Sequence, residues 1–286
     1  MSDFAFEHTQ FPTTGCEVDY DLSHPLGDAQ QQALRELLYG TGVLLFRNQS
    51  LSDEDQTRVL GYFGNVLIEE GGHREISADG NLGSSGLLFH SDLAFTPEPF
   101  KLLSLYGIEI GDECAATLFA SNVRVLDRLP SDLRARLQSA MATNVIPPSQ
   151  SERLVAFENP DFVPQTTRPA IISHPVTGQP LLFIFEQQTA RFEGLPKSES
   201  DTLLEALFAH LYAPDNIYRH SWRPGDLLIW DNIAVQHARS AQRQGVKRRM
   251  RRVAVADKTF FQLCPQFPPD DARIAAWGAG GRLELA

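Results

Sequence analysis

The sequence lacks the features that mark secreted and membrane-spanning proteins. Its three cysteines, Cys16, Cys114 and Cys264, are too few and too widely spaced for a disulfide framework or a zinc ribbon. No apolar run approaches the ~20 residues that a membrane helix needs, and the opening residues MSDFAFEHTQ lack the basic and apolar regions of a signal peptide. We therefore expect a cytoplasmic protein with no membrane partner.

Basic residues are also fewer than acidic residues. The chain has 25 Lys and Arg against 36 Asp and Glu, a net charge of -11, which disfavours a broad binding surface for nucleic acid. Hydrophobic residues make up 42% of the 286 residues and charged residues 21%, as in globular proteins. Because no repeat or low-complexity segment divides the chain, we expect one domain over residues 1–286.

What is present is a short helical region followed by many strands. Apolar spacing predicts helices at 28–39, 52–63, 132–142 and 198–212, the last three capped by Ser52, Ser131 and Ser198. Apolar runs predict strands at 43–46, 100–110, 117–120, 181–185, 217–222, 226–230 and 248–256. This order predicts a mainly β, α+β fold: a sandwich or barrel with flanking helices. Residues 144–170 carry five prolines, which indicates a lid or pocket loop.

The run LFHSDL at 88–93 is the first candidate site. In a strand, His90 and Asp92 would face the same side, with their Cα atoms roughly 6.6 Å apart. An imidazole and a carboxylate placed in this way can bind one metal ion. A HisXAsp pair alone often occurs by chance, as a surface or hydrogen-bonded pair, so the interpretation depends on a third ligand.

His237 is the best candidate for that third ligand. It lies 145 residues after Asp92, just beyond the strand expected at 226–230. Two histidines and one carboxylate leave three coordination positions open, which is the ligand set of iron(II) oxygenases, whereas zinc favours a closed tetrahedral site or a single open position. The other histidines have no such partner, and we interpret them as ordinary polar residues.

The run KRRMRRV at 247–253 allows three interpretations: a nucleic-acid patch or targeting signal, solvated charge, or a strand whose alternate side chains point inward. The third interpretation fits the apolar residues that follow. Arg248 and Arg252 then face the interior, roughly 13 Å apart along the strand. A guanidinium can hold a carboxylate by two parallel hydrogen bonds, so each arginine is a candidate partner for one acidic group.

Taken in order, these motifs resemble the taurine/2,4-dichlorophenoxyacetate dioxygenase (TauD/TfdA) family of iron(II)- and 2-oxoglutarate-dependent oxygenases. The matching segments span nearly the whole chain: FHSDLAF (89–95), ATLFA (116–120), HPVTG (174–178), RPGDLLIWDN (223–232) and residues 237–252. The resemblance implies a double-stranded β-helix core, also called a jelly roll or cupin-like fold, with flanking helices.

The resemblance also implies roles for single residues. Iron(II) is expected on the two histidines and the carboxylate of the candidate triad, where O₂ also binds. Thr117 and Arg248, which lies 11 residues after His237, are expected to hold the distal carboxylate of the co-substrate 2-oxoglutarate. Arg252, 15 residues after His237, matches an arginine that contacts the acidic group of the substrate.

The implied activity is hydroxylation of a small acidic organic molecule, in some cases with cleavage of a carbon–heteroatom bond, giving succinate and CO₂. The alternatives are desaturation or ring formation with the same cofactors, a zinc hydrolase, and a non-catalytic jelly-roll binding protein. Family members often form dimers or tetramers, so a homo-oligomer is expected. Glu69 and Glu70 stand where the taurine enzyme has a histidine-rich, substrate-touching stretch, so taurine is not the expected substrate.

Overall fold

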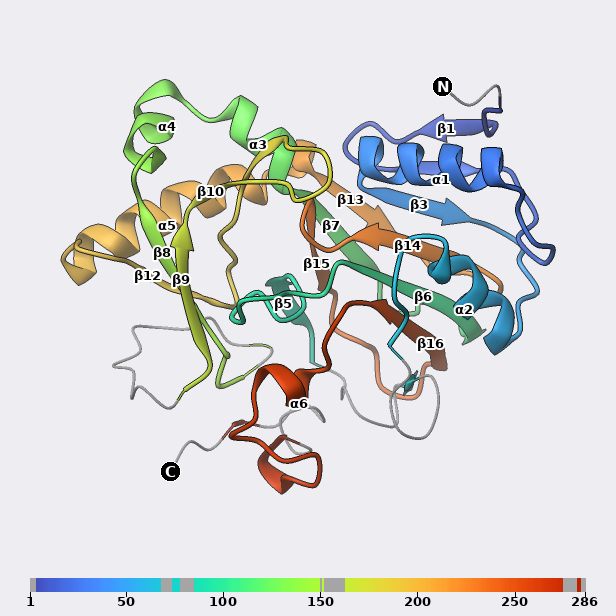
Figure 1. The fold of residues 1–286 in the computed structure, drawn as a ribbon. Coiled ribbons are helices and arrows are strands. Elements are labelled where there is room, and N and C mark those ends of the chain that lie inside the picture. The colour runs from blue at the N-terminus through green and yellow to red at the C-terminus, as the bar shows by residue number, and fades with distance from the viewer. Residues whose placement is uncertain are drawn as a thin grey trace.

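Most strands of the chain belong to two large sheets, and helices lie on either side of them (Figure 1). The computed structural model describes residues 4–67, 74–77, 85–149, 151, 163–274 and 282–283. Within these ranges, no helix combines the length and the apolar character that are needed to cross a membrane. The expected α+β composition is confirmed.

A seven-stranded sheet forms one side of the main core, in the order β1-β2-β3-β14-β6-β16-β4. Its members are β1 (His8–Gln10), β2 (Cys16–Val18), β3 (Val43–Phe46), β4 (Arg74–Ser77), β6 (Leu102–Ile110), β14 (Leu227–Asp231) and β16 (Arg248–Val255). Every residue of β3 and β14 is buried. A strand that is covered on both faces reads as a continuous apolar run, as in β3 and the first four residues of β14, which is why these two runs could be predicted from sequence.

A four-stranded antiparallel sheet forms the other side, in the order β13-β7-β15-β5. Its members are β5 (Leu87–His90), β7 (Thr117–Ser121), β13 (Ile217–His220) and β15 (Val235–Arg239). Two smaller sheets join β12 (Thr189–Phe192), β8 (Met141–Val145) and β9 (Gln165–Pro169), and β10 (Ile171–Ser173) with β11 (Pro180–Leu182).

The seven-stranded sheet separates two hydrophobic cores. Leu228 and Trp230 of β14 point into the main core, where they meet Phe119 of β7 from the facing sheet. Leu227 and Ile229 alternate with them along β14 and belong to the second core, on the outer side of the sheet. Alternate residues of a strand point to opposite faces, so the side chains between the two sheets are set by the strand register.

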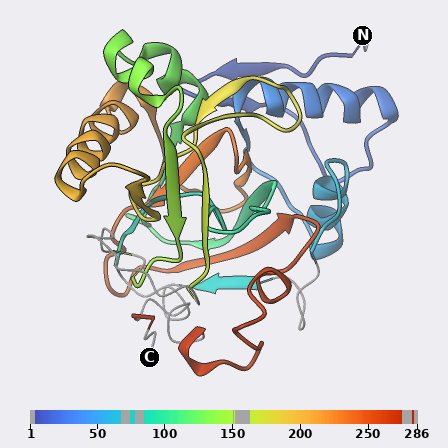
Figure 2. The same ribbon diagram turned by 60° about the vertical axis from the view of Figure 1, so that its left-hand side comes forward.

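Two N-terminal helices cover the outer face of the seven-stranded sheet: α1 (Asp28–Thr41) and α2 (Asp53–Gly61) (Figures 1 and 2). α1 ends at Gly42, which has a left-handed φ of 85° and donates its amide to Leu38 O. Ser52 caps α2 through reciprocal hydrogen bonds with Asp55. Both ends follow from local chemistry and confirm the helices that the sequence predicted there.

Three further helices gather at the other side of the molecule (Figures 1 and 2). They are α3 (Asn122–Arg128), α4 (Ser131–Leu137) and α5 (Lys197–Leu211), with the short η1 (Pro214–Asn216) after α5. Leucines of α5 pack against Val125 and Leu126 of α3 in a third hydrophobic cluster. Near the end of the chain, α6 (Phe260–Leu263) is capped by Thr259.

Four boundary predictions are wrong. The helix expected at 132–142 ends at Leu137, because Met141–Val145 pairs as β8 with both β9 and β12. α4 and α5 begin directly after Pro130 and Pro196, not at serine caps, because the fixed φ of proline suits a helix start. The strand expected at 181–185 ends at Leu182 because its partner β10 is only three residues long.

The expected lid at 144–170 is described only at its two ends. These ends are not loop: β8 and β9 pair antiparallel there, with Asn144 opposite Thr166. Ile146 and Val163, just beyond the paired residues, are buried in the main core. Residues 150 and 152–162 lie outside the described ranges, so the lid itself stays a prediction.

Candidate metal centre

His90 and His237 are neighbours across two paired strands. His90 is the last residue of β5, and His237 of β15 is directly opposite it in the antiparallel register. Directly opposed residues place their side chains on the same face of a sheet, and the centroids of the two imidazole rings are 4.2 Å apart. Both strands run near the centre of the molecule (Figure 1). Strand pairing thus brings together two residues that are far apart in sequence.

Asp92 completes the group. Its Oδ1 lies 3.3 Å from Nε2 of His90 and 3.6 Å from Nε2 of His237. One potential ligand atom from each of the three side chains lies within 4.8 Å of the other two. His90 Nδ1 is 2.8 Å from Leu88 O, a contact that orients the ring with Nε2 toward Asp92. The three side chains predicted as metal ligands therefore lie together.

Asp92 reaches this position by a different route from the one expected. The strand β5 ends at His90, and a turn follows in which Ala94 N donates to Ser91 O at 3.1 Å. Leu93 has a left-handed φ of 62°, which is outside the range of a strand. The turn, and not the alternation of side chains along a strand, aims the Asp92 carboxylate at the two imidazoles.

Asn232, which follows β14, holds this turn in place. Its Oδ1 accepts from the Asp92 amide at 2.9 Å, and its Nδ2 donates to the carbonyl oxygens of Asp92 at 3.0 Å and Phe100 at 2.8 Å. The side chain is fully buried, so these hydrogen bonds are shielded from water. Asn232 fixes the backbone of a potential metal ligand without reaching the ligand position itself.

Asp231, the neighbour of Asn232 in the chain, contacts backbone amides and His174. Asp231 Oδ1 accepts from the amides of Ile233 and Ala234, at 2.9 and 3.0 Å. Its Oδ2 lies 2.9 Å from Nε2 of His174, whose Nδ1 accepts from two backbone amides in the turn that follows. Both side chains are buried, so the HPVTG and WDN motifs form one polar assembly behind the turn of Asp92.

The charges around Asp92 favour its ionised form. Burial alone would raise the pKa of Asp92, but the charge of Arg252, and next the hydrogen bond with His90, bring it well below its usual range. Arg252 Nη2 lies 2.5 Å from Asp92 Oδ2, and its guanidinium sits over the Phe100 ring at 5.5 Å. Burial, and next the charge of His90, lower the pKa of His237 to about 3. A neutral imidazole and an ionised carboxylate are the protonation states that bind metal.

Thr117 and Arg248 are both buried. Thr117 of β7 lies two positions from Phe119, which is the register partner of His237, so Thr117 and His237 face the same side of the sheet. Arg248 begins β16, and its Nε and Nη1 have no hydrogen-bond partner among the described residues. Burial lowers the pKa of Arg248, and the neighbouring Cys114 opposes that effect. A buried guanidinium with unused donors is suited to an anionic ligand.

Sequence reasoning missed two residues near Thr117. Arg239 is buried on β15 and is the register partner of Thr117; burial, and next the charge of Arg248, lower its pKa to about 10. The alternation argument applied to Arg248 would have found it, because it lies two residues after His237. Trp222 is also buried, and its Nε1 donates to Thr117 Oγ1 at 3.0 Å. No spacing rule in the sequence connects Trp222 with Thr117.

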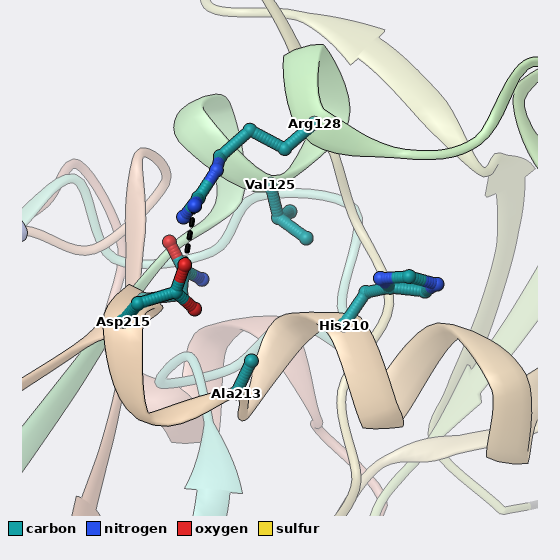
Figure 3. Close-up of a pocket in the computed structure, with 6 residues that line it drawn as sticks. Val125, Arg128, His210, Ala213 and Asp215 are labelled. Carbon is teal, nitrogen blue, oxygen red and sulfur yellow. Dashed lines mark hydrogen bonds and ion pairs between the residues drawn. The ribbon is translucent and has the colours of Figure 1, made fainter.

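Two further points concern residues beyond this group. Glu69 and Glu70 are not among the described residues. A cavity of about 120 Å³ between α3 and α5 is lined by Arg128 and Asp215, which form an ion pair, and by His210 (Figure 3). None of the residues predicted for the site lines this cavity.

The chain matches proteins of one family over most of its length. The taurine catabolism dioxygenase TauD, TfdA family matches residues 7–254. The α-ketoglutarate-dependent 2,4-dichlorophenoxyacetate dioxygenase of Cupriavidus pinatubonensis is 26% identical over 270 residues, which cover 84% of this chain and 93% of that protein. An alkylsulfatase of Acinetobacter baylyi is 27% identical over 243 residues, with 78% and 76% covered.

The fold is also found among solved structures. The crystal structure of AAD-2 in complex with Mn(II) and N-oxalylglycine aligns with a TM-score of 0.76 and 24% identity, over 90% of this chain and 99% of that one. The extent of the family match confirms the resemblance that the motifs predicted, and with it the predicted class of enzyme. This chain belongs to the taurine catabolism dioxygenase TauD, TfdA family.

Proposed function

We propose that this protein is an iron(II)- and 2-oxoglutarate-dependent dioxygenase that oxidises a small anionic organic molecule and forms succinate and CO₂. The observation that carries the proposal is the convergence of His90, Asp92 and His237, whose potential ligand atoms lie within 4.8 Å of one another. Two imidazoles and one carboxylate are the donor set of mononuclear iron(II) oxygenases, and they leave room for a chelating 2-oxo acid and O₂.

The metal ligands in this proposal are His90 Nε2, His237 Nε2 and a carboxylate oxygen of Asp92. When bound, iron(II) together with 2-oxoglutarate and O₂ supplies the oxidising chemistry. The protein supplies a neutral imidazole at His237, an ionised carboxylate at Asp92 and a fixed turn that carries this carboxylate. Asn232 keeps Asp92 in position throughout, because its hydrogen bonds go to the backbone of Asp92 and leave Oδ1 facing the two imidazoles, while Oδ2 is paired with Arg252.

Thr117 and Arg248 hold the distal carboxylate of 2-oxoglutarate in this proposal. The unused Nε and Nη1 of Arg248 support this role, because a buried guanidinium without an anion keeps its full cost of desolvation. A carboxylate that accepts two hydrogen bonds from Arg248 and one from Thr117 would satisfy these donors. The same anchoring orients the 2-oxo group of the ligand toward the metal ligands.

Arg252 is the proposed contact for the acidic group of the substrate. Its guanidinium lies beside Asp92, so a substrate bound to it would stand next to the metal. The names of two relatives, a 2,4-dichlorophenoxyacetate dioxygenase and an alkylsulfatase, indicate anionic substrates and support the choice. Hydroxylation of a carbon that carries an ether or ester oxygen gives an unstable product, which then loses that group.

Membership of the family also leads to proposals about the fold, the domain and the assembly of the protein. We propose that the seven-stranded and four-stranded sheets form a jelly roll, that residues 1–286 are one domain, and that residues 144–170 act as a lid. The shared main core between the two sheets supports the first of these. We also propose that the protein forms a homo-oligomer, which light scattering would test. Cytoplasmic location is supported by the free thiols of Cys16, Cys114 and Cys264.

The test is substrate-dependent succinate formation with iron(II) and O₂, over a panel of small carboxylates, sulfonates and sulfate esters. Asp92→Ala should abolish substrate-triggered consumption of 2-oxoglutarate. Asp127→Ala is the control, because the Asp127 carboxylate is 66% exposed and its ion-pair partner in the described part of the chain is Arg134, at 3.8 Å on the surface. Unchanged turnover of Asp92→Ala at full iron occupancy would refute the assignment, and anaerobic activity without 2-oxoglutarate would favour the zinc hydrolase.

A further inference from the structure

Trp222 contacts the candidate 2-oxoglutarate site but has no role in the proposed chemistry. It lies between β13 and β14 and is buried. Its Nε1 donates a hydrogen bond to Thr117 Oγ1 at 3.0 Å. His220, the register partner of Thr117, packs edge-to-face against the indole, with 4.6 Å between the ring centroids and 90° between the planes. The indole is therefore held by packing on one side and by a hydrogen bond on the other.

The direction of this hydrogen bond determines what Thr117 can offer a ligand. An indole N–H is only a donor, whereas a hydroxyl has one proton and two acceptor lone pairs. Thr117 must therefore accept from Trp222, which occupies one lone pair and turns the hydroxyl proton away from the indole. Within the described part of the chain, that proton has no acceptor. Without the Trp222 donor, the Thr117 hydroxyl would rotate freely and could present either its proton or a lone pair to a ligand.

The two arginine side chains associated with this pocket are also hydrogen-bond donors. Arg248 is buried and offers two unused N–H groups within the described residues. Arg239, opposite Thr117 in the register, adds a second buried positive charge. Cys114 interacts with both arginines, and burial raises its pKa, so it remains a neutral thiol at physiological pH. A ligand group here meets positive charge and hydrogen-bond donors.

We infer that Trp222 is a positioning residue: it fixes the Thr117 hydroxyl as a donor and makes the pocket selective for 2-oxo acids that end in a carboxylate. A carboxylate is an acceptor-only group and matches this arrangement at every contact. A methyl group would leave the Thr117 proton and the Arg248 donors unpaired, at a high cost in affinity. The inference rests on the proposed function, because it assumes that this pocket binds the distal end of the 2-oxo acid.

The experiment is calorimetric titration of protein loaded with Mn(II), which binds the ligand without turnover. Two ligands are compared: 2-oxoglutarate, and 2-oxopentanoate, which has the same carbon chain but no distal carboxylate. Trp222→Phe should raise the Kd of 2-oxoglutarate about fivefold, the factor expected for one neutral hydrogen bond. The Kd of 2-oxopentanoate should change less than about twofold, because that ligand makes no bond to the Thr117 hydroxyl.

A double-mutant cycle makes the test specific. In a Thr117→Val background, Trp222→Phe should cause no further loss of 2-oxoglutarate binding, because the hydroxyl that it positions is gone. Tyr218→Phe is the matched control: it removes the hydrogen bond between Tyr218 and His220 Nδ1, at 3.2 Å within β13, and should leave the ratio of the two Kd values unchanged. Melting temperatures and Mn(II) affinities verify that each variant is folded.

Two results would overturn the inference. One is an equal loss of affinity for both ligands in Trp222→Phe, which indicates a purely structural role. The other is a full additional loss when Trp222→Phe is combined with Thr117→Val. A different result would instead refute the proposed function: a wild-type protein that binds both acids with equal affinity has no pocket for a distal carboxylate.

Discussion

Replacing Asn232 by alanine should weaken both metal binding and the fold. The substitution leaves the Asp92 amide and the Phe100 carbonyl without their side-chain partner in a buried site. Each such orphaned group costs about 1–3 kcal/mol, so the free energy of unfolding should fall by about 2–6 kcal/mol. Because the turn that carries Asp92 is also released, metal affinity should fall about 10–100-fold, as is typical when a group that orients a metal ligand is lost.

The assay combines urea denaturation of the metal-free protein with competitive titration of Mn(II) or iron(II). Asn65→Ala is the matched control, because within the described residues the Asn65 side chain makes one hydrogen bond, Nδ2 to Ala256 O at 2.9 Å, and none to the Asp92 turn. It should lose only about 1 kcal/mol of stability and keep its metal affinity. A metal affinity of Asn232→Ala within twofold of wild type would refute the idea that this amide positions Asp92.

Three further predictions concern the rest of the molecule. Arg248→Lys should raise the Kd of 2-oxoglutarate about tenfold, because an ammonium cannot form two parallel hydrogen bonds. Arg249→Lys, on the exposed face of β16, should leave this Kd unchanged. Equal effects of the two substitutions would contradict the assignment of Arg248 to the distal carboxylate. Gly225→Ala should destabilise the protein more than Gly178→Ala. Both glycines have positive φ, but a Cβ at Gly225 would lie 2.7 Å from Gln49 O, whereas a Cβ at Gly178 would meet nothing within 4 Å. Urea denaturation measures the free energy of unfolding of both variants, and equal losses would contradict this prediction. Burial raises the pKa of the Cys264 thiol from 9.0 to about 12, so the folded state holds that proton more tightly than the unfolded chain. The free energy of unfolding should therefore fall as the pH rises from 9 to about 12, and Cys264→Ala should reduce this slope; an identical slope would show that another group is responsible.

The sequence predicts the buried parts of the fold best. The strands Val43–Phe46 and Leu227–Asp231 are covered on both sides, so every position is apolar or fills a buried site, and the run is visible without any partner. The segment Met141–Val145 is different, because its residues suit a helix as well as a strand. Its state is decided by pairing with β9 and β12, which come later in the chain.

For the site, residue types could be predicted but their positioning could not. His90, Asp92 and His237 are recognisable because few other combinations give two imidazoles and a carboxylate in a family motif. The left-handed Leu93 that aims Asp92 has no sequence signal, since a leucine rarely takes that conformation. The contact between Trp222 and Thr117 depends on where two strands and a loop meet, which a one-dimensional pattern does not contain.

The pairing of β5 with β15 has a consequence for how the protein is made. About half of the chain lies between His90 and His237. Among the described strands, β5 is an edge strand that joins its sheet only through β15. While the ribosome is still synthesising the middle of the protein, the nascent chain can offer an ion at most one of these imidazoles and the nearby carboxylate. Tight capture of ferrous iron must wait until the late strands have folded, which keeps a redox-active ion away from the unfinished polypeptide.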